Sequence, residues 1–207
     1  MPQLLVTILM AMLGLVVTVG LAMLAVTSLR QGRCRARLAD MAGELGFRFS
    51  REDPFEISRR YAEFILVAAG HSPVAANMIS GHVEGMAVRA FDFQYEAGHG
   101  SRRMMRRYAV ILLETESPLP RLLMWHHADF PPIPARQATH VRGPWSITGD
   151  GELADDFLAA CAPWFARGGC VEIADHAILL ATPGQTGRNG FTQPLPDIVK
   201  TVKRLLK

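Results

Sequence analysis

The feature that most constrains this chain is an uncharged stretch from Leu4 to Leu29, LLVTILMAMLGLVVTVGLAMLAVTSL. As a helix rising about 1.5 Å per residue, these 26 residues cover roughly 39 Å, more than a hydrocarbon core of about 30 Å. The sequence therefore predicts a transmembrane helix over residues 4–29, preceded by a short extracytoplasmic segment of residues 1–3.

A cleaved signal peptide is the alternative interpretation of the same stretch. A signal peptide has Lys or Arg before a shorter apolar core and a small-residue cleavage site after it. The residues before Leu4 are Met-Pro-Gln, which carry no charged side chain, and no small-x-small site follows the apolar stretch. We therefore expect an uncleaved anchor.

Four arginines follow the apolar stretch, namely Arg30, Arg33, Arg35 and Arg37, and residues 1–37 contain no acidic residue. Because positively charged flanks stay on the cytoplasmic side, the sequence predicts a single-pass protein of the cell membrane. Its N-terminus is expected outside and residues 30–207 in the cytoplasm. The three cysteines form no CxxC pair, which fits a reducing compartment. We expect the four arginines to contact the lipid bilayer or a partner at its surface.

Small residues recur every four positions within the apolar stretch, at Gly14, Thr18 and Ala22. A stripe of this kind lets two membrane helices approach closely. A homo-oligomer formed through the stripe is one hypothesis, and a chance recurrence in an apolar helix is the alternative.

The formal net charge of +3 comes from the segment beside the membrane. Subtracting the four arginines of residues 1–37 from +3 leaves −1 for residues 38–207. A nucleic-acid groove needs basic charge spread over one face of a domain. We therefore expect no nucleic-acid partner.

Residues 30–48 are expected to form a basic juxtamembrane segment that includes a helix. CRARLADMAGELGF has apolar residues at helical spacing, and Gly46 is a stop signal. This helix either continues the membrane helix or follows it after a short break. The remaining residues, 49–207, are sufficient for one compact cytoplasmic domain.

From residue 77 the apolar residues alternate with a period of two, which indicates β-strands. NMISGHV and MAVRAFDFQYE predict a hairpin that turns at Glu84-Gly85 and places Phe91 and Phe93 on one buried face. RYAVILLET is apolar on both faces, as in a central strand. RLLMWH and VRGPWSIT (141–148) predict two shorter strands.

Two helices and a further hairpin are predicted after residue 148. GDGELADDFLAACAPWF predicts a helix with Asp150 as its N-cap, which Pro163 ends or kinks. VEIADHAILLAT predicts a hairpin turning at Ala174-Asp175, and LPDIVKTVKRLLK an amphipathic helix. Consecutive hairpins between helices predict an α+β protein: a transmembrane helix followed by one domain with a mainly antiparallel sheet and packed helices.

The hairpin GHVEGMAVRAFDFQYE has the pattern G-x-x-x-G-x-x-V-x-A-F-D-x-x-Y-E. With LADMAGELGFRF before it and GDGELADDFL and DHAILL after it, the chain resembles uncharacterised bacterial single-pass membrane proteins that carry a domain of unknown function. The resemblance covers most of residues 38–206. It implies the anchored organisation and no activity, so it transfers no catalytic residue.

The stretch MWHHADFPPIP contains the first candidates for an enzyme site, His126, His127 and Asp129. On an extended strand His126 and His127 point to opposite faces, whereas His127 and Asp129 share one face. Zinc needs three or four ligands, and the other histidines lie at no recognised ligand spacing. We expect a strand end with partly solvated histidines, a metal or acid–base site at His127 and Asp129 being the alternative. No cofactor is expected.

The stretch SRRMMRR carries two methionines and four arginines at a predicted hairpin tip, namely Arg102, Arg103, Arg106 and Arg107. A solvated loop is one interpretation. The functional alternative is contact with anionic lipid headgroups or with an acidic partner.

Two function hypotheses follow. The first is a membrane-anchored, non-catalytic domain that binds a partner or scaffolds an assembly at the inner face of the membrane. The alternative is a membrane-tethered hydrolase or metal-dependent enzyme that uses His126, His127 and Asp129.

Overall fold

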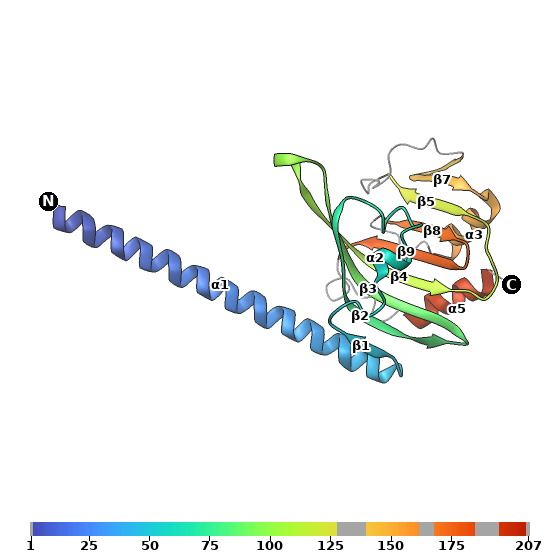
Figure 1. Ribbon diagram of the computed structural model, residues 1–207, viewed down its shortest axis with the longest axis horizontal. Helices are drawn as coiled ribbons and strands as arrows, with labels where there is room; N and C mark the ends of the chain where they lie inside the picture. The colour runs from blue at the N-terminus through green and yellow to red at the C-terminus, as the bar shows by residue number, and fades with distance from the viewer. Residues whose placement is uncertain (1, 128–139, 162–167, 185–194, 206–207) are drawn as a thin grey trace. The chain divides into compact units, whose positions relative to one another are not determined.

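The computed structural model describes residues 2–127, 140–161, 168–184 and 195–205 (Figure 1). The chain divides into two compact units, Met1–Arg37 and Leu38–Lys207.

The first unit is formed by α1 (Pro2–Glu44), one continuous helix that extends into the second unit. An 18-residue window of α1 is long enough and apolar enough to cross a membrane, and none of that window is buried. Leucine, valine and methionine side chains along it are exposed. A large exposed apolar surface marks a place of contact with membrane or protein, so α1 suggests a membrane anchor.

The last turns of α1 belong to the second unit. Leu38 and Ala42, one helical turn apart, are each only 1% exposed. The helix ends where Gly46 adopts a φ of 70°, with the Phe47 amide donating to the Ala42 carbonyl at 2.7 Å. This is a glycine-dependent C-cap, and it confirms Gly46 as the stop signal. The helix continues through residues 30–44 without a break.

The second unit is built on one sheet, which has nine strands within the described residues (Figure 1). Its order is β1-β2-β3-β4-β9-β8-β5-β7-β6, and every neighbouring pair is antiparallel. The strands are β1 (Arg48–Ser50), β2 (His71–Val83), β3 (Met86–Ala97), β4 (Met104–Glu114), β5 (Leu122–His126), β6 (His140–Arg142), β7 (Trp145–Gly149), β8 (Cys170–Ala174) and β9 (Ala177–Pro183). The predicted antiparallel α+β architecture is confirmed.

The hairpin between β2 and β3 turns at Glu84-Gly85, as predicted, with both residues at positive φ. β2 begins six residues earlier than the alternation indicated, because two irregularities in its pairing with β3 interrupt the period of two. The preceding strand, β1, was not predicted.

One predicted turn and one predicted strand are wrong in detail. The β8–β9 hairpin turns at Asp175-His176 rather than Ala174-Asp175, since Ala174 pairs with Ala177 and Asp175 takes the positive φ. The predicted strand 141–148 is two strands, β6 and β7. They are separated by Gly143-Pro144, where proline has no amide hydrogen to continue a ladder.

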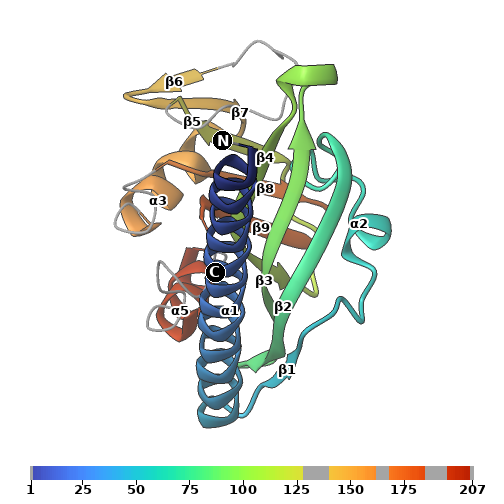
Figure 2. The ribbon, with the colours of Figure 1, turned by 90° about the vertical axis from the view of Figure 1, so that its left-hand side faces the viewer.

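Helices cover one face of the sheet (Figure 2). They are α3 (Gly151–Cys161) and α5 (Leu195–Leu205), which contact each other. The carboxylate of Asp150 accepts from the amides of Glu152 and Leu153 at 3.0 and 3.1 Å, which confirms it as the N-cap of α3. Pro163 lies outside the described residues.

The opposite face is covered by residues 51–70, which we call the strap (Figure 2). The strap contains one short helix, α2 (Ile57–Arg60). Its buried apolar side chains pack against side chains from β3, β4 and β9 in one cluster. Phe91 and Phe93 are both in this cluster, with exposures of 0% and 1%, which confirms their predicted buried face. The sheet therefore has an apolar core on each side.

Replacing Phe93 by alanine should lower the free energy of unfolding by about 3–5 kcal/mol, because the vacated space lies in the cluster between sheet and strap. Urea unfolding of a fragment of residues 38–207 measures the loss. Gln94→Ala is the matched control, since Gln94 is the next residue on β3 and points to the other face while only half-buried. Equal stability of the two variants would contradict the assigned register.

Candidate functional site

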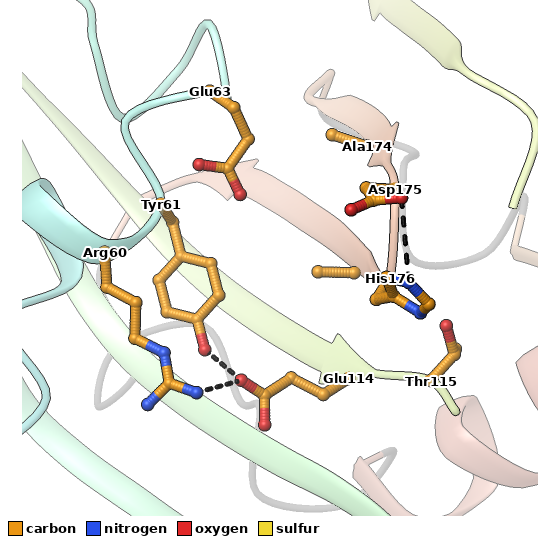
Figure 3. Close-up of a pocket in the computed structure, with 9 residues that line it drawn as sticks. Arg60, Tyr61, Glu63, Glu114, Thr115, Ala174, Asp175 and His176 are labelled. Carbon is orange, nitrogen blue, oxygen red and sulfur yellow. Dashed lines mark hydrogen bonds and ion pairs between the residues drawn. The ribbon is translucent and has the colours of Figure 1, made fainter. Parts of the chain in front are cut away.

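A group of polar side chains lies where the strap meets the end of β4 (Figure 3). One carboxylate oxygen of Glu114, Oε1, accepts hydrogen bonds from the Tyr61 hydroxyl and from Arg60 Nη2, the latter at 3.1 Å. Arg89 Nη1 lies 3.0 Å from the same oxygen and 2.9 Å from the Tyr61 hydroxyl oxygen. We call these four residues the Glu114 cluster. It links the strap to two neighbouring strands.

The Glu114 cluster shifts the pKa values of Glu114 and Tyr61 in opposite directions. Burial raises the pKa of Glu114, but the hydrogen bond from Tyr61 and the charges of Arg89 and Arg60 outweigh burial and lower that pKa overall. Burial, followed by the hydrogen bond to Glu114, raises the pKa of Tyr61 far above its ordinary value. A general acid or base works best with a pKa near the working pH. The cluster is therefore suited to holding structure, not to transferring protons.

A second carboxylate, that of Glu172 in the sheet, forms hydrogen bonds with the strap. Glu172 lies on β8 and is only 5% exposed. Its oxygens accept the backbone amides of Ile65 at 2.6 Å and of Leu66 at 3.3 Å. Burial raises the pKa of Glu172 to about 7, and the two backbone hydrogen bonds oppose this rise. Glu172 thus satisfies two strap amides that would otherwise face an apolar sheet.

A pocket of about 320 Å³ opens beside the Glu114 cluster (Figure 3). Its far wall is the β8–β9 turn, where Asp175 Oδ1 and His176 Nε2 lie 3.7 Å apart. The full lining is Arg60, Tyr61, Glu63, Glu114, Thr115, Ala174, Asp175, His176 and Ala177. Both signs of charge are present, so the pocket offers polar contacts without a strong preference for anions or cations.

A second pocket, of about 610 Å³, is lined in part by Arg89. The Arg89 guanidinium stacks over the Phe55 ring at 4.6 Å, and Arg89 Nε is buried without a hydrogen-bond partner among the described residues. Ser80 and His82 from β2 also line this pocket. Glu114 lines both pockets.

The structure describes two of the three residues of the alternative enzyme site, His126 and His127. His127 Nε2 lies 2.6 Å from the hydroxyl of Ser146, while the His126 ring packs edge-on against Trp145 at 5.1 Å. The two histidines therefore face different neighbours, as the strand geometry predicted. Asp129 lies outside the described residues. No group of three or more possible metal ligands occurs in the part of the chain that the structure describes.

The arginines predicted to contact membrane or partner fall into two separate sets. Arg30, Arg33, Arg35 and Arg37 lie on α1. The other set lies around the β3–β4 turn, but it is not all in the turn: η1 (Gly100–Arg102) contains Arg102, whereas Arg106 and Arg107 lie in β4. Their contacts stay a prediction. Gly14, Thr18 and Ala22 are all exposed on α1, and their pairing with a second copy also stays a prediction.

Sequence reasoning missed every residue of the Glu114 cluster and Glu172. One signal was present: Glu172 interrupts the apolar run of β8, and Arg89 occupies the same face of β3 as Phe91 and Phe93. A charge on a predicted core face indicates a buried partner or cap. Tyr61 lies 28 residues from Arg89 in the sequence, and Ile65 lies 107 residues from Glu172, so spacing alone could not identify these partners.

No protein-family model matches this sequence, and no curated protein matches it. Among solved structures, the fold is similar to that of the mycobacterial trehalose monomycolate transport factor A, TtfA. The TM-score is 0.57 at 16% sequence identity, and the match covers 84% of this chain and 94% of that one. At this identity the similarity establishes the fold, not the function.

Glu172→Gln should change how stability depends on pH. In the folded protein the pKa of Glu172 is about 7, above the ordinary value of 4.5. Protonated Glu172 therefore contributes to the free energy of unfolding fully below pH 4.5, and this contribution is lost as pH rises through 7. The loss is on the order of 3 kcal/mol. The glutamine side chain of the variant does not titrate. Urea unfolding should therefore show that the variant gains stability relative to the wild type as pH rises from 4.5 to 7. A pH-independent difference would contradict the assignment.

Proposed function

We propose that this chain is a single-pass, membrane-anchored, non-catalytic factor whose cytoplasmic domain binds a partner in a membrane transport assembly. The observation that carries the proposal is α1: an exposed, membrane-length apolar helix joined directly to a compact domain. A helix of this kind supports a position of the domain at the bilayer surface.

The orientation in the proposal comes from the charges that flank the apolar stretch. Arg30, Arg33, Arg35 and Arg37 follow it, and residues 1–37 contain no acidic residue. Retention of positive flanks on the cytoplasmic side supports an N-terminus outside and residues 30–207 inside the cell.

The transport role is drawn from the similar fold of TtfA, a protein described as a transport factor for trehalose monomycolate. We extend from that description only the general role of an accessory factor in membrane transport. The low identity leaves the transported molecule of this chain open, because a shared fold hosts different functions.

The non-catalytic part of the proposal is supported by the Glu114 cluster. Its carboxylate accepts hydrogen bonds or ion pairs from three side chains at once, and its tyrosine pKa is raised. Groups held in this way provide a fixed polar surface beside two pockets. A fixed surface costs little entropy when a partner binds, which favours recognition.

A reporter fused after Lys207 should behave as a cytoplasmic protein. The expected result is green fluorescence from a fluorescent-protein fusion and no activity from an alkaline phosphatase fusion, because phosphatase needs an oxidising compartment. Neutral replacement of Arg30, Arg33, Arg35 and Arg37 should reduce this bias. Phosphatase activity of the unchanged chain would reverse the proposed orientation.

Capture from native membranes should test the partner. Crosslinked cells would provide two samples, one with the full chain and one with residues 1–37 alone. Integral membrane proteins of transport function should be enriched with the full chain only, since the domain is the proposed binding part. Identical sets from both samples would show that the helix accounts for the associations and would contradict a partner-binding domain.

A further inference from the structure

The β3–β4 hairpin extends past the strands on either side of it, and we call its end, residues 97–107, the basic tip. β3 and β4 pair as far as Ala97 and Met104, whereas the ladder between β4 and β9 stops at Tyr108 and Pro183. The ladder between β2 and β3 stops at Glu96. The basic tip contacts its neighbours in two places: the Gly184 amide donates to the Arg107 carbonyl at 2.9 Å, and the His71 and His99 ring centroids lie 5.5 Å apart. The end of the hairpin projects beyond the rest of the sheet (Figure 1).

The turn of the basic tip has a defined conformation. Gly98 has a φ of 90°, and a Cβ there would lie 2.6 Å from the Arg102 carbonyl oxygen, so the close approach requires glycine. The Arg102 amide donates to the His99 carbonyl at 3.2 Å, and Arg103 Nη1 lies 3.2 Å from Glu96 Oε2. The tip is thus a folded projection with a fixed set of exposed side chains.

Those side chains combine positive charge with apolar surface. Residues 97–107 contain four arginines and no acidic residue. Met104 and Met105 are 54% and 49% exposed. In the described part of the second unit, the other large apolar side chains so exposed are Val74 and Val141, which stand singly. A pair of exposed methionines among arginines indicates a contact surface.

We propose that the basic tip inserts into the headgroup region of an anionic bilayer leaflet. Arginine side chains would bind lipid phosphates, and the two methionines would enter the boundary with the acyl chains. Met104 and Met105 point to opposite faces of the hairpin, because successive strand residues alternate. A bilayer surrounds an inserted tip and receives both faces. The surface of an acidic protein would contact one face, so the geometry favours lipid.

The tether makes weak docking sufficient. The apolar stretch ends at Leu29 and the second unit begins at Leu38, which leaves eight residues between them. As a helix these residues span about 12 Å. The domain therefore stays close to the bilayer, and the effective lipid concentration at its surface is high. This inference rests on the proposed membrane anchoring.

The test uses the full chain in vesicles whose acyl chains carry bromine, which quenches nearby tryptophan. Met104→Trp places the reporter at the tip, and the unchanged chain provides the background from native tryptophans. We expect loss of reporter emission in phosphatidylcholine–phosphatidylglycerol vesicles and none in phosphatidylcholine alone. High salt should restore emission, since the Debye length falls to about 3 Å at 1 M. Bromine in both leaflets makes the readout independent of orientation.

Two matched controls separate docking from general effects. Met86→Trp places the reporter at the other end of β3, roughly 36 Å along the strand, where emission should be unchanged. In the Met104→Trp chain, Arg102→Gln with Arg107→Gln should abolish the quenching. Lys200→Gln with Arg204→Gln removes two exposed charges from α5 instead and should leave it intact.

The outcomes distinguish this inference from the proposed function. Flotation of the chain with vesicles, without quenching at residue 104, would overturn tip insertion while leaving the anchor in place, and would make an acidic protein the partner class for the arginines. Quenching that is equal in neutral vesicles, or that survives the Arg102 and Arg107 changes, would also overturn it. A chain that fails to float would overturn the anchor and this inference together.

Discussion

The central strands bury side chains on both faces, so the sheet needs protein on each side. Helices α3 and α5 supply one cover, but the other is the strap, which is largely irregular backbone around one short helix. Irregular backbone brings amide groups against an apolar surface, and an unsatisfied buried amide costs about 1–3 kcal/mol. The Glu172 carboxylate accepts hydrogen bonds from two of these amides, those of Ile65 and Leu66. A buried carboxylate on β8 is therefore the condition for an irregular segment to cover this face.

The same requirement accounts for the charges at the strap edge. Arg89 is only 8% exposed, and an isolated guanidinium in such a place would be strongly unfavourable. Glu114 forms an ion pair with Arg89, and the Tyr61 hydroxyl is hydrogen-bonded to both of these residues. The Phe55 ring covers the Arg89 guanidinium. Both pockets are lined by Glu114 and by other residues of this arrangement. Their polar lining is thus a consequence of fixing the strap, and a partner would meet a surface already rigid.

Local patterns predicted most of the sheet, but not how the strap packs on it. Alternation and turn residues identified the β2–β3 hairpin, and Asp150 marked the start of α3, because these signals act between neighbours in sequence. Strap residues have no period, since their conformation follows the sheet beneath them. Glu172 and Ile65 are 107 residues apart, and their bond depends on tertiary packing. His126 and His127 were the first candidates for an enzyme site in the sequence. In the structure, His126 packs against Trp145 and His127 lies within hydrogen-bond distance of Ser146.

The proposed anchoring changes the requirements for binding by the second unit. A free domain needs an interface large enough to offset the loss of translational freedom, whereas a tethered one has largely lost that freedom already. Continuity of α1 up to Glu44, with Leu38 buried in the second unit, leaves only a short connection to the apolar stretch. Under the proposed anchoring, a small surface such as one hairpin end or one polar pocket would be sufficient for recognition. Removal of α1 would then weaken such contacts, because it would remove the high effective concentration that anchoring provides.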